Sequence, residues 1–336
     1  MNNLARVVTP FPTQRFSEEL PTPVNMEGMP CIFRITSINC RQRDTKCIEY
    51  TATIYHERAA MKVQWTRNQP DPRLKPFMLV SPRWFAKTLS ENGAIKICRL
   101  VLLERPESQE NLFQTVPHGW VKNRELIKQA ASLVDVLPRA YRFLFNAIFW
   151  NGERFRRYCT GPSSKHGHHN YDNGNLIHSV DVALRMQMEC MGKAQTDTAL
   201  GIIAGLLHDA GKADEYRLSS TGEWILTDRG TLLGHKVTII EWMAQALVTC
   251  RILMPEAHYQ GLLHCLTSAQ NAPEWLGIRT PMMQEALLLS GHDRFSGNED
   301  LIQRNAPLKE GWGSYHKHLR GRPYQLGGIS TDTELP

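Results

Sequence analysis

The hydrophobic pattern of this chain changes its period once, near residues 105–114, and that change limits the folds open to it. Residues 31–65 alternate apolar and polar side chains, interrupted by a polar turn and a tight connection, which predicts three consecutive antiparallel strands. A further strand is expected at 94–103, after a helix-like segment at 81–90. Four or five short strands with a helix before the last predict a small OB-like β-barrel, and a β-sandwich or meander stays open as the alternative.

Beyond the polar linker the pattern is helical, apart from a hairpin-like stretch at 223–230 and a polar loop at 160–175. Helices are expected at 123–136, 138–150, 176–190, 197–210, 235–254, 256–269 and 282–291. We therefore predict an α+β chain in four parts, which are an N-terminal extension (1–30), an OB-like domain (31–112), an all-α domain (113–298) and a C-terminal tail (299–336).

Composition indicates a folded, soluble protein. The 336 residues are 42% hydrophobic and 21% charged, and no apolar run reaches the roughly eighteen residues of a membrane span. The first residues lack the apolar core and cleavage site of a secretory signal, so we expect a cytoplasmic location and no membrane contact. The eight cysteines include no C-x-x-C pair and are expected to be free thiols, mostly buried.

The strongest chemical signal is the segment LGIIAGLLHDAGKADEY at 200–216. An apolar helix leads directly into His208 and Asp209, and an ionised carboxylate at the end of a buried helix is costly unless a positive charge meets it. A divalent metal would meet it, because imidazole and carboxylate together suit Mn²⁺, Fe²⁺, Zn²⁺ or Mg²⁺. Further ligand types stand on neighbouring predicted helices or at their ends: His178, His235, His264 and Asp293.

These residues resemble the H…HD…D pattern of HD-domain metal-dependent phosphohydrolases, with the ligand positions on His178, His208, Asp209 and Asp293. The strings PSSKHGHHNYDNGNLIHS, LLGHKVTIIEW and LLHCLTSAQNAPEWLGIRTPMMQEALLLSGHD extend the resemblance to the bacterial YhaM family of 3'-to-5' exoribonucleases, over about residues 30–300. That family joins an N-terminal OB domain to an HD domain, so the resemblance implies an HD fold for 113–298.

The resemblance also implies a mechanism. A divalent metal, Mn²⁺ first among the candidates, would bind the scissile phosphate and lower the pKa of a bound water. Asp209 and Lys212 would be the catalytic residues, with Lys212 touching the phosphate as a point charge. His168 and His169 would contact the phosphate as well.

One departure from the family pattern affects the metal site. Where the family has a tandem His-His pair, this chain has Ala269 and Gln270, and neither side chain replaces an imidazole. A second metal would then rest on His235 and His264 without a third histidine. We expect one firmly held metal or a weakened second one, and reduced or redirected catalysis is the sceptical interpretation.

The formal charge of +6 is concentrated in the first third of the chain, where residues 1–120 hold 16 Lys and Arg against 11 Asp and Glu. A modest basic excess on an OB-like domain fits a single-stranded nucleic acid, and the resemblance favours RNA. The exposed candidates in the turn RQRDTK are Arg41, Arg43 and Lys46. Strand aromatics are more often core than stacking platforms, which applies to Phe33, Tyr50, Tyr55 and Trp65. Two tail histidines, His316 and His318, are expected to be solvated.

Four functions are consistent with these features. The first is a phosphodiester hydrolase, a 3'-to-5' exonuclease on single-stranded RNA or DNA. The second is an HD-containing relaxase-like protein of a mobile element, which would nick a defined DNA sequence. The third is an OB-HD single-strand-binding protein with weakened catalysis, which the missing His-His pair keeps open. The fourth, a small-molecule nucleotide phosphohydrolase, leaves the OB-like domain without a purpose.

Overall fold

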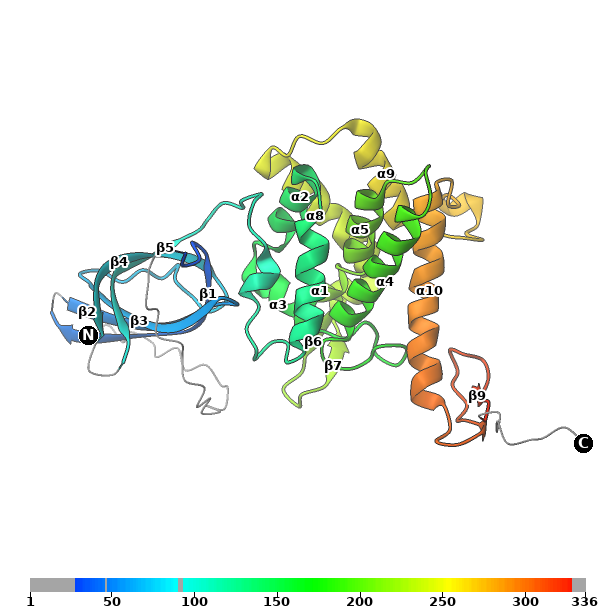
Figure 1. The fold of residues 1–336 in the computed structure, drawn as a ribbon, viewed down its shortest axis with the longest axis horizontal. Helices are drawn as coiled ribbons and strands as arrows, with labels where there is room; N and C mark the ends of the chain where they lie inside the picture. The colour runs from blue at the N-terminus through cyan, green and yellow to red at the C-terminus, as the bar shows by residue number, and fades with distance from the viewer. Residues whose placement is uncertain (1–27, 46, 90–92, 328–336) are drawn as a thin grey trace, which may run out of the picture.

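The structure is a computed structural model that describes residues 28–45, 47–89 and 93–327. It confirms the α+β architecture, because a closed five-stranded barrel is followed by a mainly helical region, and the two lie next to each other along the long axis of the molecule (Figure 1). Within the described residues, none of the helices combines the length and the apolar character that a membrane span requires.

The barrel closes in the strand order β1-β2-β3-β5-β4, with β3 and β5 parallel and the other neighbours antiparallel. Its strands are β1 (Phe33–Asp44), β2 (Cys47–His56), β3 (Ala59–Arg67), β4 (Leu79–Leu89) and β5 (Ile95–Leu102). Every second side chain points inward, as in β3, where Ala59, Met61, Val63 and Trp65 are buried. This small closed barrel is the OB-like domain that the alternation predicts.

The helix expected at 81–90 is wrong, because this part of the chain forms β4. The strand pairs with β1 at one end and with β5 along most of its length. These ladder hydrogen bonds join residues distant in sequence, and they outweigh the local helical pattern. The aromatic side chains Phe33, Tyr50, Tyr55 and Trp65 are at most 9% exposed, so none presents a stacking face. Phe33, Tyr50 and Trp65 fill the barrel, whereas Tyr55 packs outside it against His118 and Arg124.

Two helices form the centre of the helical region, α4 (Gly174–Met191) and α5 (Thr198–Leu207). They pack closely against each other (Figure 1). Around them stand α1 (Arg124–Asp135), α2 (Arg139–Phe149), α3 (Gly152–Thr160), α6 (Lys212–Glu215), α7 (Asp228–Leu232), α8 (Gly234–Cys250), α9 (Glu256–Thr267) and α10 (Gln284–Asn305). The remaining elements are the 3-10 turns η1 (Leu112–Thr115) and η2 (Glu274–Leu276) and two hairpins, β6 (Tyr216–Leu218) with β7 (Trp224–Leu226) and β8 (Gly311–Trp312) with β9 (Tyr324–Gln325).

The short helices α6 and α7 were not expected, and two longer helices also differ from the expectation. A helix, α3, forms where none was predicted, because Asn151 caps its start by accepting from the Arg154 amide and Phe155 and Tyr158 are buried. The last helix, α10, does not end at 291 but continues to Asn305, so Asp293 lies within a helix and not after one. Buried residues in its second half explain the extension: Ser296, Gly297, Asp300 and Leu301.

Arg34 joins the barrel to the helical region. Its guanidinium is fully buried and donates to the Thr115 hydroxyl at 2.8 and 3.0 Å and to the Phe77 carbonyl at 2.7 Å. It also lies 5.2 and 5.1 Å from the ring centres of Trp120 and Phe155. Because a buried guanidinium needs all of these partners, this contact fixes the barrel against the first helices.

All eight cysteines lie in the described residues and all are free thiols. The expectation that most of them are buried is wrong, since only Cys159, Cys190 and Cys265 are. Those three stand in the helical core, whereas the three strand cysteines of the barrel, Cys40, Cys47 and Cys98, are not buried.

Candidate metal centre

Two helices bring the first pair of histidines together. His178 stands in α4 and is fully buried, and His208 directly follows the apolar helix α5. Their Nε2 atoms lie 3.2 Å apart. This approach depends on Gly205, because a Cβ at that position would lie 2.6 Å from the Cα of Ala183 in α4.

Hydrogen bonds at the opposite ring nitrogens aim both Nε2 atoms inward. His208 Nδ1 lies 2.8 Å from the Gly205 carbonyl, which can only accept, so Nδ1 carries the proton and Nε2 carries a lone pair in the neutral ring. Burial lowers the pKa of His208, which favours that neutral ring. His178 Nδ1 is held by the Ser296 hydroxyl of α10 at 3.0 Å. Metal-binding histidines are oriented by such contacts at the nitrogen that does not bind the metal.

Two carboxylates complete the cluster. Asp209 Oδ2 lies 3.5 Å from His178 Nε2 and 3.6 Å from His208 Nε2. Asp293 Oδ1 lies 3.1 Å from His178 Nε2 and 3.8 Å from His208 Nε2. The helices α4, α5 and α10 therefore converge on one point with two nitrogens and two oxygens.

The spacing of these four donors fits a metal. Bonds of about 2.1 Å place two ligands about 3.0 Å apart at a right angle and about 3.4 Å apart in a tetrahedron. The five separations given above run from 3.1 to 3.8 Å, which is close to the spacing that a shared ion would produce. Two overlapping groups could hold an ion, namely His178 with His208 and Asp293, and His168 with His178 and Asp209.

Both carboxylates are held in the charged form. Burial alone would raise the pKa of Asp209, but Lys212 and the neighbouring histidines outweigh burial and place the pKa well below its usual range. Lys212 Nζ donates to Asp209 Oδ2 at 2.5 Å. Burial acts against Asp293 too, and the hydrogen bond from His178 together with His208 lowers its pKa to about 2. The cluster therefore offers two charged carboxylates and the neutral ring of His208, as a cation requires.

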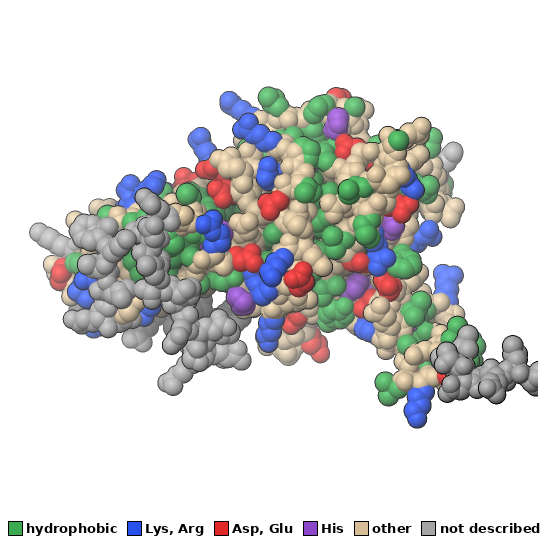
Figure 2. All heavy atoms as spheres, in the orientation of Figure 1, with side chains coloured by type: hydrophobic (Ala, Val, Ile, Leu, Met, Phe, Trp, Pro, Cys, Tyr) green, Lys and Arg blue, Asp and Glu red, His purple; other side chains and the backbone are tan. Residues whose placement is uncertain are grey.

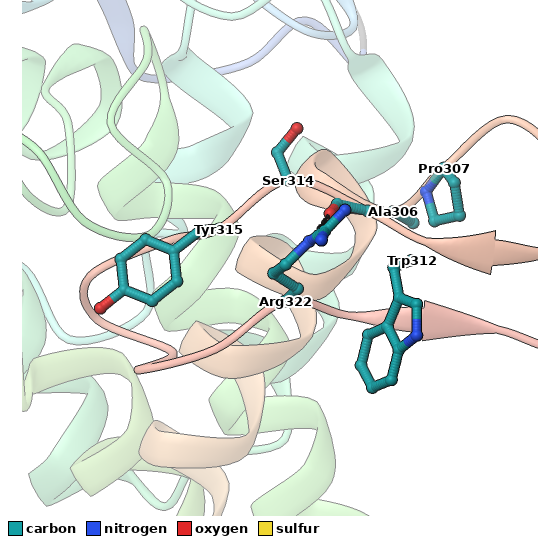
Figure 3. A pocket seen from close by; sticks show the side chains of 7 residues that line it. Ala306, Pro307, Trp312, Ser314, Tyr315 and Arg322 are labelled. Atoms are coloured by element: carbon teal, nitrogen blue, oxygen red, sulfur yellow. Dashed lines mark hydrogen bonds between the residues drawn. The ribbon is translucent and has the colours of Figure 1, made fainter.

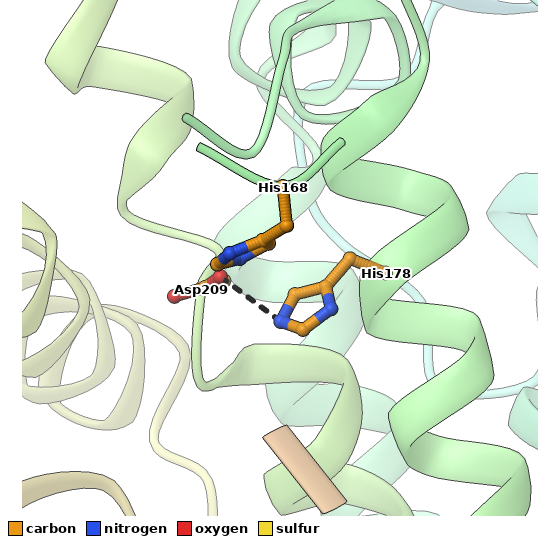
Figure 4. Close-up of side chains that lie close together, drawn as sticks. All are labelled: His168, His178 and Asp209. Atoms are coloured by element: carbon orange, nitrogen blue, oxygen red, sulfur yellow. Dashed lines mark ion pairs between the residues drawn. The ribbon is translucent and has the colours of Figure 1, made fainter. Parts of the chain in front are cut away.

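His168 and His169 lie against the same cluster (Figure 4 shows His168 facing His178 and Asp209). The His168 and His169 ring centres lie 4.9 and 5.3 Å from that of His178. Burial first, and then neighbouring positive groups, lowers the pKa of each ring to about 4. Among the described residues neither Nε2 atom has a hydrogen-bond partner. Both rings are thus neutral near pH 7 and have a free nitrogen.

His235 approaches Asp209 from the other side. Its Nε2 lies 3.4 Å from Asp209 Oδ1, and Glu215 holds its Nδ1 at 3.2 Å and its backbone amide at 3.0 Å. Gly211 allows this approach, since a Cβ there would lie 2.1 Å from the His235 carbonyl oxygen. Asp209 therefore presents one oxygen to His178 and His208 and the other to His235.

Among the described residues, no hydrogen bond or ion pair joins the His264 ring to the His/Asp cluster. His264 Nε2 accepts from the Met282 amide at 2.8 Å, and Gln270 accepts from Arg294 at 3.2 Å. Within the described residues, neither His264 nor His235 belongs to a group of donors spaced for an ion.

The structure describes two of the three basic barrel residues that were expected to bind nucleic acid. Arg41 and Arg43 do not lie in a turn, as the sequence predicts, because β1 continues to Asp44 and pairs with β2 there. Both are exposed at the outer end of β1, and Arg43 pairs with Glu49 at 2.5 Å. Lys46 lies outside the described residues. The pairing of Arg43 reduces the positive charge that this end of β1 can offer to a phosphate.

Four polar residues that hold the histidines or Lys212 in place were not predicted from the sequence: Ser163, Glu215, Ser296 and Asp300. Asp300 accepts from the His169 amide at 2.8 Å, and Ser163 lies 3.2 Å from Lys212 Nζ. The sequence held a signal for two of them, because Glu215 belongs to the segment that carries His208, and Ser296 stands three residues after Asp293 on one helix.

Comparison with known proteins supports the resemblance at a distance. Over 167 residues, 50% of this chain and 51% of the relative, the sequence is 26% identical to the 3'-5' exoribonuclease YhaM of Bacillus licheniformis. The chain thus spans about half the length of the curated relative that it matches. No family model and no solved structure matches it. With the barrel and the His/Asp cluster, this similarity indicates distant homology to YhaM.

Proposed function

We propose that this chain is a metal-dependent phosphodiester hydrolase that removes nucleotides from the 3' end of single-stranded RNA. The observation that carries the proposal is the convergence of two imidazole nitrogens and two carboxylate oxygens at ligand spacing. The distant homology to an exoribonuclease supplies the substrate class and the direction. In this proposal the OB-like domain (31–112) binds the strand and the HD domain (113–298) cleaves it.

The metal would be held by His178, His208, Asp209 and Asp293. When bound, it would polarise the scissile phosphate and lower the pKa of a water near it. This mixed set of nitrogen and oxygen donors suits Mn²⁺ first, and also Fe²⁺, Zn²⁺ or Mg²⁺. A second metal would have only Asp209 Oδ1 and His235 Nε2 close together, so one firmly held ion is proposed.

Lys212 would supply positive charge to the substrate. Its ammonium is almost buried, with a side chain 10% exposed, and it sits between Asp209 and Ser163. A phosphate drawn to the cluster would come within reach of this group, which can donate to a phosphoryl oxygen while it stays paired with Asp209. His168 and His169 would contact the phosphate as neutral rings, because their pKa values lie near 4.

The test combines metal analysis with cleavage of a 5'-labelled single-stranded RNA in added Mn²⁺. The wild-type protein should contain metal and shorten the RNA from its 3' end. The Asp209→Asn variant should lose both properties, whereas Asp228→Asn, which changes an exposed carboxylate of α7, should keep them. Circular dichroism checks that each variant is folded. Full activity in folded Asp209→Asn would refute the site.

One observation favours a second candidate, a single-strand-binding protein with weakened catalysis. Ala269 and Gln270 replace the tandem histidines, and the Nε2 atom of His264 is already engaged by a backbone amide. A wild-type protein that contains no metal, leaves the RNA intact and still binds it would put this candidate first.

A further inference from the structure

A cleft of about 510 Å³ opens beside the candidate metal centre, and a volume of this size can hold a small ligand. His168 and Asp293 line its inner end. Its other walls come from the 164–168 loop, from α10 and from the chain that follows α10. They carry side chains that are cationic or can become so: Lys165, His166, Arg294, Lys317 and His318. The cleft is therefore suited to an anionic substrate.

The chain after α10 is a folded hairpin and not a free tail. The Ser314 amide donates to the Asn305 carbonyl at 2.9 Å, and the Gly313 amide donates to the Pro323 carbonyl at 2.8 Å. Gly313 makes this docking possible, because a Cβ there would lie 1.9 Å from the Asn305 oxygen. The first of these hydrogen bonds attaches the hairpin to the end of the helix that carries Asp293, and the second closes the hairpin itself.

The hairpin exposes large aromatic side chains. Trp312 is 61% exposed and Tyr315 is 66% exposed. Both line a second pocket together with Arg322, whose side chain lies between them in Figure 3. Aromatic faces next to a guanidinium are the elements with which proteins bind single-stranded nucleic acids, since bases stack and phosphates are neutralised.

The charge of the hairpin has the sign that such a ligand requires. Residues 306–327 hold four Lys and Arg against one Glu. Lys309, Lys317, Arg320 and Arg322 are all exposed. Figure 2 shows basic side chains around this part of the molecule, beyond the end of α10.

We propose that residues 306–327 form the binding wall for the RNA nucleotides upstream of the scissile bond. A base stacks in the pocket of Trp312, Tyr315 and Arg322, and the backbone passes Lys317 and His318 into the metal centre. This inference rests on the proposed function for the direction of the strand. It assigns substrate binding to a part of the chain outside the resemblance that first indicated an exonuclease.

The test compares a long and a short substrate in the full-length protein. The variant Tyr315→Ala with Arg322→Gln removes one exposed ring and one charge from the pocket that would hold the stacked base, away from the cleft at the metal centre. Lys128→Gln, which removes an exposed charge from α1, is the matched control. Each protein is assayed with a single-stranded RNA of twelve nucleotides and with a dinucleotide, which is too short to reach the pocket of Trp312, Tyr315 and Arg322 from the metal centre. The Kd of the long RNA is measured separately by fluorescence anisotropy.

The double variant should raise the KM and the Kd for the long RNA about tenfold or more, as expected for losing one stacked base, while its kcat and its rate on the dinucleotide stay unchanged. Tyr315→Phe, which keeps the ring, should bind like the wild type. An unchanged KM and Kd in the double variant would overturn the binding wall. If the metal-loaded wild type cleaves neither substrate, the proposed function fails, and the anisotropy comparison still decides whether the hairpin binds RNA.

Discussion

The close approach of α4 and α5 at Gly205 leads to a prediction that tests the geometry of the metal centre without changing any proposed ligand. Gly205→Ala would place a Cβ 2.6 Å from the Cα and 2.9 Å from the amide nitrogen of Ala183. Those atoms belong to the backbone and cannot rotate away. The two helices must therefore separate, and with them His178 and His208.

The magnitude follows from comparison with Gly201→Ala in the same helix. There the new Cβ would meet the Cys190 sulfur at 3.0 Å and the end of the Met186 side chain at 3.3 Å, which can move. Both variants gain the same helix propensity, so their difference isolates the overpacking, which costs about 1–3 kcal/mol. Gly205→Ala should thus unfold about 2–12 °C below Gly201→Ala. Misplaced histidines should also weaken metal binding by about 10- to 100-fold.

The assays are thermal denaturation of the metal-free proteins and titration of each with Mn²⁺. Measuring both properties in both variants separates an effect on the stability of the fold from an effect on metal binding. If Gly205→Ala unfolds at the same temperature as Gly201→Ala and binds Mn²⁺ equally well, then the contact between α4 and α5 does not set the distance between the two histidines.

Two further predictions concern pH and salt. The folded protein holds His168 neutral, with a pKa near 4 against an ordinary value of about 6.5. As the pH falls, the unfolded chain therefore protonates this histidine before the folded protein does, and stability is lost between about pH 6.5 and 4. In metal-free protein His168→Gln should therefore flatten the fall in Tm over that window, and parallel curves for variant and wild type would contradict the assignment. Replacing Arg41, Arg43 and Lys46 together by Gln should weaken single-strand binding and reduce its salt slope by up to about 2, and an unchanged slope would remove these residues from the binding surface.

The sequence predicts best the features that local patterns encode. Alternation identified the strands of the barrel other than β4, because each has one buried and one exposed face. His208 and Asp209 stood out because a polar pair directly follows a fully apolar helix. His178 was found through the family pattern, and the structure places it beside them.

The features that the sequence did not predict depend on contacts between distant residues. β4 is a strand because it pairs with β1 and β5. The second half of α10 contains Ser296, Gly297 and Asn298, which disfavour a helix locally. Packing overrides that preference, since Gly297 lies so close to His168 that a Cβ would be 2.9 Å from its Nδ1. No short-range pattern reveals such a contact.

In the proposed exonuclease, the uninterrupted course of α10 would limit the length of the product. Asp293 and Asn305 stand on one helix, twelve residues apart, so the metal centre and the base of the hairpin are separated by about 18 Å along a rigid rod. An RNA that is shortened from its 3' end keeps both contacts only while it spans that distance. Trimming should then slow abruptly at one oligonucleotide length. The length of the helix sets this limit, so it should not depend on the sequence of the RNA.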